Sequence, residues 1–553
     1  MSTRDRSNSI NNIIVTLFFA ACWAMLFLVY PYHLIYKEQM TLFTCNRAYL
    51  SMLLAKPGFV AVAAGDFLTQ MFLLTGGAAT VTVLVAIIFW DGVRRALKSL
   101  GVEKNPGIFA LIPAVSEIIL SCILEYRLAL PIGAAVAVWL FVMWDSTNNR
   151  IVRTVSGAIL LVAVYPLVGA HSLIFIILMA FSLGRNHNIG AGIACLVAGL
   201  AIIFLEGWFY LLTPFQRFAY PLVEKYLIRN IYIFAITEVA LILAVLLGKL
   251  ALKRCFAIPF IVLLSAGGFW MVHNAEEEYD LKISTLAYYG KWDKVLEMGL
   301  DNPLKTQTAA YYANLALARE GRLADGLLDR YQPLFYGLFL PVQSNESYLK
   351  VIASIDALLE AGDYAQAQHS ALLGMTFTPD QRSSRVARKL VEISLSNGDS
   401  TSAGKYLNML KTTLLHRKWA EQAEAVFSQE NYSVQNVNSD ILYVTNDYPA
   451  ALRNTLDSNP NADHTAQYLL CYDLLTKDIM SFKSDYDKYY LPHNRGIIPP
   501  KVYQEALEML EAGPEYCISP EVKEQNQDFL NDNHGRYQTS YWFYFLYAEP
   551  EEK

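Results

Sequence analysis

The stretch CFAIPFIVLLSAGGFWMVH, Cys255–His273, followed by Asn274-Ala-Glu-Glu-Glu-Tyr-Asp280, divides the chain into two halves. Its nineteen residues are nearly all apolar or small, which is the length and composition of a helix that crosses the hydrocarbon core of a bilayer. The three consecutive glutamates mark the point at which this helix leaves the membrane for water. Similar apolar stretches precede it and none follows it. We therefore expect a transmembrane domain over residues 1–273 and a soluble domain over residues 274–553.

The two halves carry opposite net charges. Residues 1–273 have a formal charge of +8 and residues 274–553 of −14, which together give the −6 of the whole chain. Nucleic-acid binding needs a basic surface, so the acidic soluble half predicts no nucleic-acid partner. The bilayer is the partner that the first half predicts, because membrane proteins concentrate Lys and Arg in their cytoplasmic loops.

Nine apolar segments of the first half are predicted to span the membrane. The first is too long for the apolar region of a signal peptide, and further spans follow it, so we expect it to be retained. The weakest is 173–183, which is short enough to be a half-span or a re-entrant segment. The predicted spans are 13–36, 71–90, 108–125, 128–144, 155–170, 173–183, 189–212, 231–247 and 255–273.

Basic residues predict the orientation of these spans. With the N-terminus inside, the cytoplasmic segments hold twelve Lys and Arg, from Arg4 to Arg254, and the opposite loops hold seven. The positive-inside rule then places the N-terminus in the cytoplasm. An odd number of spans places residues 274–553 outside it. We therefore expect the C-terminal domain to lie outside the cytoplasm.

Acidic residues within or beside the spans are the candidate functional residues of this half. A charge in hydrocarbon is costly, so such residues face a bundle interior or a water-filled cavity. On the predicted topology, five acids lie along the outer side and suit an outward-facing cavity for a cation, a proton or a hydroxyl-bearing substrate. The alternative is that each acid only stabilises helix packing. The cavity-lining candidates are Glu117, Glu206 and Glu238, and Glu38 and Asp66 lie at the outer mouth.

Patterns for cofactors and metals are missing from the sequence. We find no Walker phosphate loop, no GxGxxG after a strand, no HExxH and no GxSxG. The seven cysteines include no CxxC pair and no Cys/His cluster with metal spacing. We therefore expect no cofactor and no metal site. Cys471 and Cys517 lie in the soluble half, where they are either two free thiols or, after export, a disulfide.

A glycine-centred phrase recurs in the soluble half, at intervals near the period of a helical-hairpin solenoid. The third copy is Ala361-Gly-Asp-Tyr-Ala-Gln-Ala367. Glycine suits the left-handed turn that ends a first helix, and a small residue five positions later lets the second helix pack closely. The pattern resembles a tetratricopeptide-type repeat over residues 279–418, although Ser400 replaces the usual aromatic residue in the fourth copy. The turn and packing residues are Gly290, Trp292, Gly321, Leu323, Gly362, Tyr364, Ala367, Gly398 and Ala403.

The whole layout resembles an uncharacterised family of polytopic membrane proteins of the Bacteroidota. The matching phrases are Glu38-Gln39 with Leu42-Phe43 after the first span, Pro57-Gly58 before the second, and the aromatic tail Tyr541–Tyr544. The resemblance implies the architecture, a membrane domain with a tetratricopeptide-like half, and no activity. Because that family is bacterial, the resemblance also implies an inner-membrane protein whose C-terminal domain lies in the periplasm.

Our leading interpretation is a non-enzymatic membrane anchor that presents a helical-repeat domain to a protein partner in the cell envelope. The alternative is an enzyme that resembles polytopic lipid-linked sugar transferases, which carry an acidic residue in a first outer loop with surface-lying helices. That resemblance implies Glu38 or Asp66 as the base, although these two acids are separate and the acids of that superfamily form a cluster. The third interpretation is a transporter, for which the sequence has no evident inverted repeat.

Overall fold

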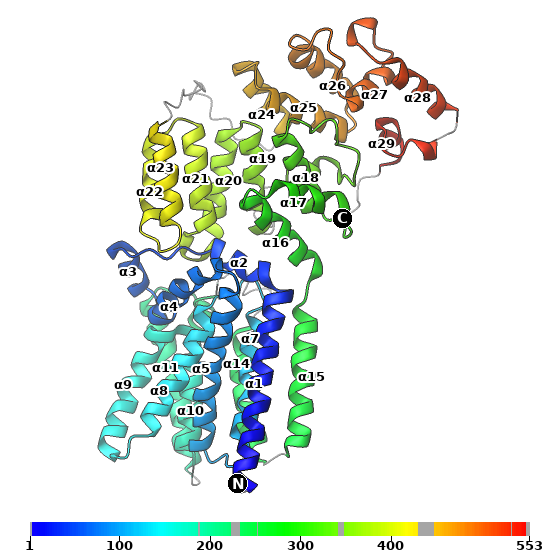
Figure 1. The fold of residues 1–553 in the computed structure, drawn as a ribbon. Helices are drawn as coiled ribbons and strands as arrows, with labels where there is room; N and C mark the ends of the chain where they lie inside the picture. The colour runs from blue at the N-terminus through cyan, green and yellow to red at the C-terminus, as the bar shows by residue number, and fades with distance from the viewer. Residues whose placement is uncertain are drawn as a thin grey trace. The chain divides into compact units, whose positions relative to one another are not determined.

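The structure is a computed structural model of the chain and describes residues 3–185, 188–222, 233–250, 253–340, 348–429, 447–531 and 534–548. These residues form helices joined by turns and contain no strand, so the prediction of an all-α fold is confirmed for them. The chain divides into two compact units (Figure 1). The first unit consists of Met1–Asn274 with Met409–Lys418, and the second of Ala275–Asn408 with Trp419–Lys553.

The first unit is a bundle of apolar helices with short helices in its connections (Figure 1). Its helices are α1 (Thr3–Val29), α2 (Pro31–Gln39), α3 (Arg47–Leu54), α4 (Phe59–Thr69), α5 (Gly77–Ser99), α6 (Pro106–Phe109), α7 (Leu111–Leu120), α8 (Ala129–Asp145), α9 (Arg150–Val168), α10 (Ser172–Leu183), α11 (Ile189–Phe209), α12 (Gln216–Ala219), α14 (Ile236–Lys249) and α15 (Arg254–Val272). Single 3-10 turns are η1 (Gln70–Leu73), η2 (Gly169–His171) and η3 (Ile233–Ala235).

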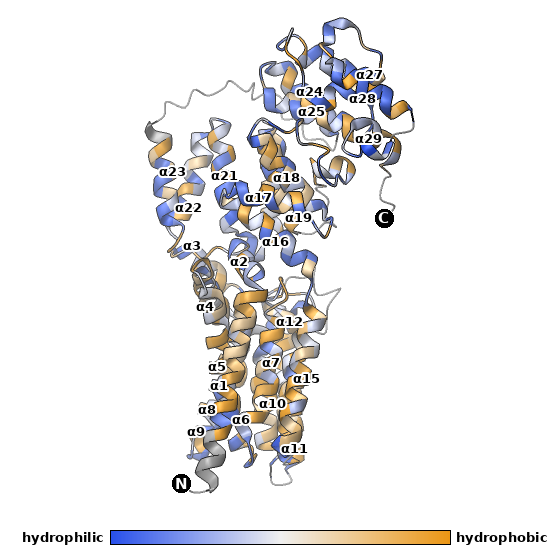
Figure 2. Ribbon diagram, turned by 45° about the vertical axis from the view of Figure 1, so that its right-hand side comes forward, coloured by the Kyte–Doolittle hydropathy of each residue, from blue (hydrophilic) through white to orange (hydrophobic). Residues whose placement is uncertain are grey.

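Five segments of this unit are long and apolar enough to cross a membrane: Ile10–Val29, Gly77–Ser99, Arg150–Leu183, Ile189–Phe209 and Arg254–Val272. Their outward apolar side chains are exposed, as a lipid-facing surface requires. Leu263 of α15, for example, is 72% exposed, and Val197 of α11 is 62% exposed. Figure 2 shows the predominantly hydrophobic colouring of α1, α5, α8 and α10. The chain is therefore a membrane protein by the length and composition of these helices.

The structure differs from the nine predicted spans at several places. The predicted first span, 13–36, is broken at Tyr30, and α2 starts at Pro31, because proline has no N–H to continue the helix and its ring collides with the preceding turn. The predicted spans 155–170 and 173–183 fall in a single stretch, Arg150–Leu183, that is interrupted only by η2. Helices α7, α8 and α14 are shorter than a full span, so a count of nine stays a prediction.

The second unit is built of amphipathic helices, which Figure 2 shows in mixed blue and orange. They are α16 (Ala275–Tyr288), α17 (Trp292–Asp301), α18 (Gln307–Arg319), α19 (Tyr348–Glu360), α20 (Tyr364–Phe377), α21 (Ser384–Ser396), α22 (Ser400–Lys411), α23 (Arg417–Gln429), α24 (Tyr448–Ser458), α25 (Asp463–Leu475), α26 (Ile479–Asp485), α27 (Lys501–Met509), α28 (Pro520–Leu530) and α29 (Tyr541–Tyr547). Shorter turns are η4 (Leu334–Gly337), η5 (Pro379–Gln381), η6 (Tyr486–Tyr490), η7 (Pro514–Tyr516) and η8 (His534–Arg536).

The four glycines of the recurring phrase all have positive φ, between +68° at Gly290 and +77° at Gly362. This is the left-handed region, which costs glycine little and other residues more. Three of them join two α-helices: α16 to α17, α19 to α20, and α21 to α22. Gly321 ends α18 but is followed by turns over residues 323–328 rather than by a second helix. Gly326 and Pro333 explain this difference, because both residues disfavour a helix interior.

Substitutions in the α19–α20 hairpin test its turn. We expect Gly362→Val to cost roughly 1–3 kcal/mol because valine is strained at positive φ. Ala367→Trp should cost as much or more, since Ala367 is fully buried and a large side chain would overpack its site. The measurement is hydrogen exchange of peptides from α19 and α20 in the full-length protein. His369→Gln changes an exposed position of α20 and is the control. Equal exchange in all three variants would contradict a structural role for the turn.

Candidate functional site

A buried polar cluster lies where α7, η2 and α14 of the first unit meet. It contains Glu117 of α7, Tyr126 of the following loop, His171 of η2, and Thr237 and Glu238 of α14. Each of these five residues is at most 5% exposed. Ionisable residues in such surroundings mark functional sites more often than chance, because burying them costs free energy.

Local backbone geometry places the histidine of this cluster. Helix α9 ends at Val168, and Gly169 has φ +69° and ψ −134°, a conformation that only glycine adopts readily. The chain then makes the single turn η2 and continues as α10. His171 is the last residue of that turn and has no exposed surface.

Hydrogen bonds connect the members of the cluster in one continuous series. His171 Nδ1 lies 2.8 Å from Glu238 Oε1, and His171 Nε2 lies 3.3 Å from the hydroxyl of Tyr126. Tyr126 donates to Glu117 Oε2 at 2.8 Å, and Thr237 donates to Glu117 Oε1 at 2.7 Å. His171 thereby contacts Glu238 directly and is linked to Glu117 through the hydroxyl of Tyr126. Such an arrangement can hold a proton and pass it between the carboxylates.

A buried cation lies next to the cluster. Lys37 of α2 donates from Nζ to the carbonyl oxygens of Ser121, at 2.6 Å, and Tyr126, at 2.8 Å. Lys37 is 7% exposed. Its ammonium group also interacts with the charge of Glu125. The cluster therefore contains two carboxyl groups and one imidazole, with one ammonium group held by backbone carbonyls at the Tyr126 end.

The structure brings two of the three predicted cavity-lining acids together. Glu117 and Glu238 meet at His171, whereas no hydrogen bond or ion pair among the described residues joins Glu206 of α11 to them. Glu206 instead lies within electrostatic range of Tyr165 and Tyr210. The functional role of all three acids stays a prediction.

The two acids predicted at the outer mouth each have a separate partner in the first unit. Asp66 of α4 accepts from Arg127 Nη2 at 3.0 and 3.2 Å and from the Tyr49 hydroxyl at 2.7 Å. Glu38 of α2 lies 2.7 Å from His416 Nε2, which the segment Met409–Lys418 contributes. Both pairs are buried. Neither acid contacts Glu117 or Glu238 through an ion pair or hydrogen bond among the described residues.

A family model covers nearly the whole chain. It is described as a family of unknown function (DUF6057), and it matches residues 6–548. The chain belongs to this family. No curated protein and no solved structure matches the chain. The prediction of an uncharacterised family over nearly the full length is therefore confirmed, and the family itself assigns no activity to this DUF6057 protein.

Sequence reasoning about this DUF6057 chain missed His171, Tyr126, Thr237 and Lys37. A signal was present for His171, because it is a lone histidine between two predicted spans, in the sequence GAHSL. No such sequence signal marked Tyr126 and Thr237, since tyrosine and threonine are ordinary residues at the ends of apolar segments. Within the described residues no group of His, Cys, Asp and Glu has the geometry of a metal site.

The second unit contains a buried charge network between its hairpins. Asp356 of α19 lies 2.8 Å from Lys389 Nζ and 3.5 Å from Arg385 Nη2, both of α21. Arg385 also donates to Ser284 of α16 at 2.9 Å and to Tyr312 of α18 at 3.0 Å. Burial alone would raise the pKa of Asp356, but the two cations hold this pKa below its ordinary value. The network therefore links four helices of the second unit.

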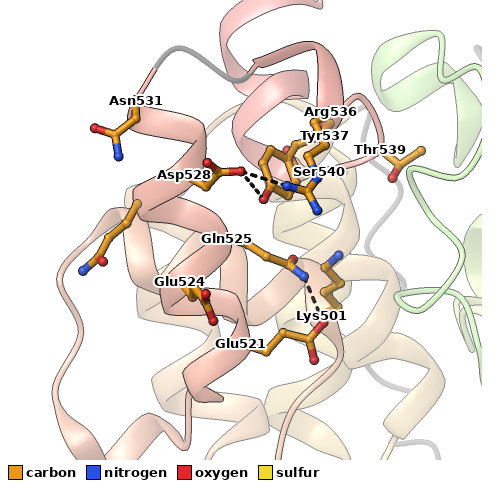
Figure 3. A pocket seen from close by; sticks show the side chains of 11 residues that line it. Lys501, Glu521, Glu524, Gln525, Asp528, Asn531, Arg536, Tyr537, Thr539 and Ser540 are labelled. Carbon is orange, nitrogen blue, oxygen red and sulfur yellow. Dashed lines mark hydrogen bonds and ion pairs between the residues drawn. The ribbon is translucent and has the colours of Figure 1, made fainter.

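An open cavity of about 700 Å³ lies on the C-terminal helices of the second unit. Figure 3 shows its polar lining, in which the Tyr537 hydroxyl donates to Asp528 Oδ2 at 2.7 Å and Gln525 donates to Glu521 at 2.9 Å. Several polar groups of the lining thus bind one another. Nothing in this arrangement favours one ligand over another.

Proposed function

We propose that this protein is an integral protein of a bacterial inner membrane that presents a tetratricopeptide-like domain to a protein partner in the cell envelope. On this proposal, residues 1–273 anchor the protein through about nine spans, in which the short helices α7, α8 and α14 contribute partial or tilted crossings. Residues 274–553 form the periplasmic domain, in an assembly or scaffolding role. A source among the Bacteroidota fits the motifs noted above.

The observation that carries this proposal is the set of three helical hairpins, each closed by a glycine with positive φ. Stacked hairpins of this kind expose repeated helix faces, and a chain of them offers an extended surface to another protein. The residues at the second-helix packing position support the same interpretation, since Val295, Ala367 and Ala403 are buried. The hairpin pattern recurs through α22, while the break after Gly321 departs from a regular repeat.

Reporter fusions test the proposed topology. We expect alkaline phosphatase fused after Asp280 to be active, because that enzyme folds only outside the cytoplasm, and a fusion after Lys98 to be inactive. The reason is the excess of Lys and Arg in the loops assigned to the inside, twelve against seven. A reporter that is active only in the cytoplasm should give the reverse pattern at the same two sites. Activity of alkaline phosphatase after Lys98 alone would overturn the orientation.

Photo-cross-linking tests whether the second unit binds a protein partner. A photo-reactive residue in place of Leu372, which is 45% exposed on α20, should cross-link to the same protein in intact cells each time. That adduct should be lost in the Gly362→Val variant at equal abundance. Cross-linking that persists when the hairpin is disrupted would contradict recognition through the repeat.

The transferase alternative would use Glu38 or Asp66 as a base. The contacts support it less well, because the Asp66 carboxylate already accepts two bonds from Arg127 and one from Tyr49. A carboxylate paired with a guanidinium is a weak base.

A further inference from the structure

The two carboxylates of the intramembrane cluster differ in their hydrogen-bond partners. Glu117 accepts one hydrogen bond on each oxygen, from Thr237 and from Tyr126. Among the residues that the structure describes, Glu238 has a single hydrogen-bond partner, His171 Nδ1, on Oε1, and its buried Oε2 has none. Burying an ionised oxygen without a donor costs much more than burying a neutral one. The contacts therefore favour an ionised Glu117 and a neutral, protonated Glu238.

We propose that this cluster is an intramembrane proton relay, which carries one proton between Glu238 and Glu117. This function is independent of the proposed role of the second unit. The ligand of the site is the proton, and its path is the hydrogen-bonded chain through His171 and Tyr126. The three links of that chain measure 2.8, 3.3 and 2.8 Å.

The transfer balances without another reactant. At the start, Glu238 donates its proton to His171 Nδ1, the neutral imidazole donates from Nε2 to the Tyr126 oxygen, and Tyr126 donates to ionised Glu117. Each proton then moves one step: the Glu238 O–H bond breaks as an N–H bond forms at Nδ1. The Nε2–H bond breaks as the Tyr126 oxygen gains a proton, and the original tyrosine proton binds Glu117. One proton has moved, and His171 has changed its tautomer.

The charged and titratable groups around the cluster fit an ionised Glu117 and a neutral Glu238. Helix α2 contributes the ammonium group of Lys37, which donates to the Tyr126 carbonyl. Cys122 and the partly exposed Glu125 lie near that ammonium group. From α14, Thr237 contributes a neutral donor. One carboxylate balanced by one ammonium group leaves little net charge inside the membrane, and Glu125 marks the Tyr126 end as the side nearer to solvent.

Infrared spectroscopy of the full-length protein in lipid nanodiscs tests the proton assignment. The C=O stretch of a neutral carboxyl group is separate from the bands of a carboxylate. At about pH 7, Glu238→Gln should remove one neutral carboxyl band, and Glu117→Gln should remove carboxylate intensity and keep that band. Glu206→Gln is the control, because Glu206 lies outside the cluster, and it should leave the Glu238 band in place. Persistence of the band in Glu238→Gln would overturn the proposal.

Solvent exchange tests the relay itself. In heavy water the neutral carboxyl band shifts as its proton exchanges, and Tyr126→Phe should slow this shift by about tenfold or more, because the path from the solvent side is interrupted. If Tyr126→Phe does not assemble, His171→Gln interrupts the same path. Equal exchange rates in wild type and a folded variant would overturn the relay. Replacing Na⁺ by choline should have no effect, and a change in the Glu238 band on this replacement would reassign the site to a metal cation.

Discussion

Replacing Asp356 by asparagine should increase the local opening of the helices around it by about 100-fold or more. Asparagine has nearly the same shape, so the main change is the loss of one negative charge beside Lys389 and Arg385. Removing one partner of a buried ion pair costs about 3–5 kcal/mol. Lys389 keeps its ion pair with Glu392, at 2.7 Å, so we expect an effect at the lower end of this range. Hydrogen exchange of peptides from α19 and α21, followed by mass spectrometry of the full-length protein, measures this opening.

The control for this experiment is Asp325→Asn, which makes the same chemical change at an exposed position of the same unit. It should change local opening by less than about threefold. The effect of Asp356→Asn should also depend on pH. The pKa of Asp356 is lowered in the folded protein, so its stabilisation is present above about pH 4 and is lost as the pH falls through the lowered pKa. A constant difference between wild type and variant down to the most acidic conditions would contradict the ion pair.

Replacing Asp66 by asparagine should destabilise the first unit by about 3–5 kcal/mol, because the buried guanidinium of Arg127 then loses the negative charge of its ion pair. The side chains of both residues are less than 8% exposed, so water cannot take over the role of the carboxylate. Thermal unfolding of the detergent-solubilised protein, followed by tryptophan fluorescence, should show a Tm lowered by roughly 5–15 °C. The double variant Asp66→Leu/Arg127→Met should recover part of this loss, since both charges of the buried pair are then replaced by apolar groups.

Asp91→Asn is the matched control in the first unit. Asp91 is also paired with arginines, Arg94 and Arg95, but these side chains are partly exposed, so the change should cost about 1 kcal/mol or less. The comparison also bears on the transferase alternative. If Asp66 served only as a catalytic base, Asp66→Asn would unfold at the same temperature as wild type.

The sequence by itself determined the class of this protein, an all-α chain with segments that can span a membrane. Whether a segment such as Arg254–Val272 can span a membrane depends on its own length and hydropathy, and these are properties of consecutive residues. The glycine turns were predictable for a related reason, because a left-handed turn such as that at Gly362 favours glycine whatever surrounds it. The interruption at Pro31 was also readable in principle, since proline breaks a helix locally.

Only the tertiary structure decided which polar groups share a site. Glu117 and Glu238 lie far apart in sequence and in helices that carry the same kind of apolar pattern as α11 with Glu206, so no local signal distinguishes these three acids. The packing of α7 and α14 around η2 brings the first two to His171 and leaves Glu206 elsewhere. The hydropathy of acidic residues predicts that burying them costs free energy. Which partner compensates each of them depends on the contacts between helices, and these form only when the whole bundle packs.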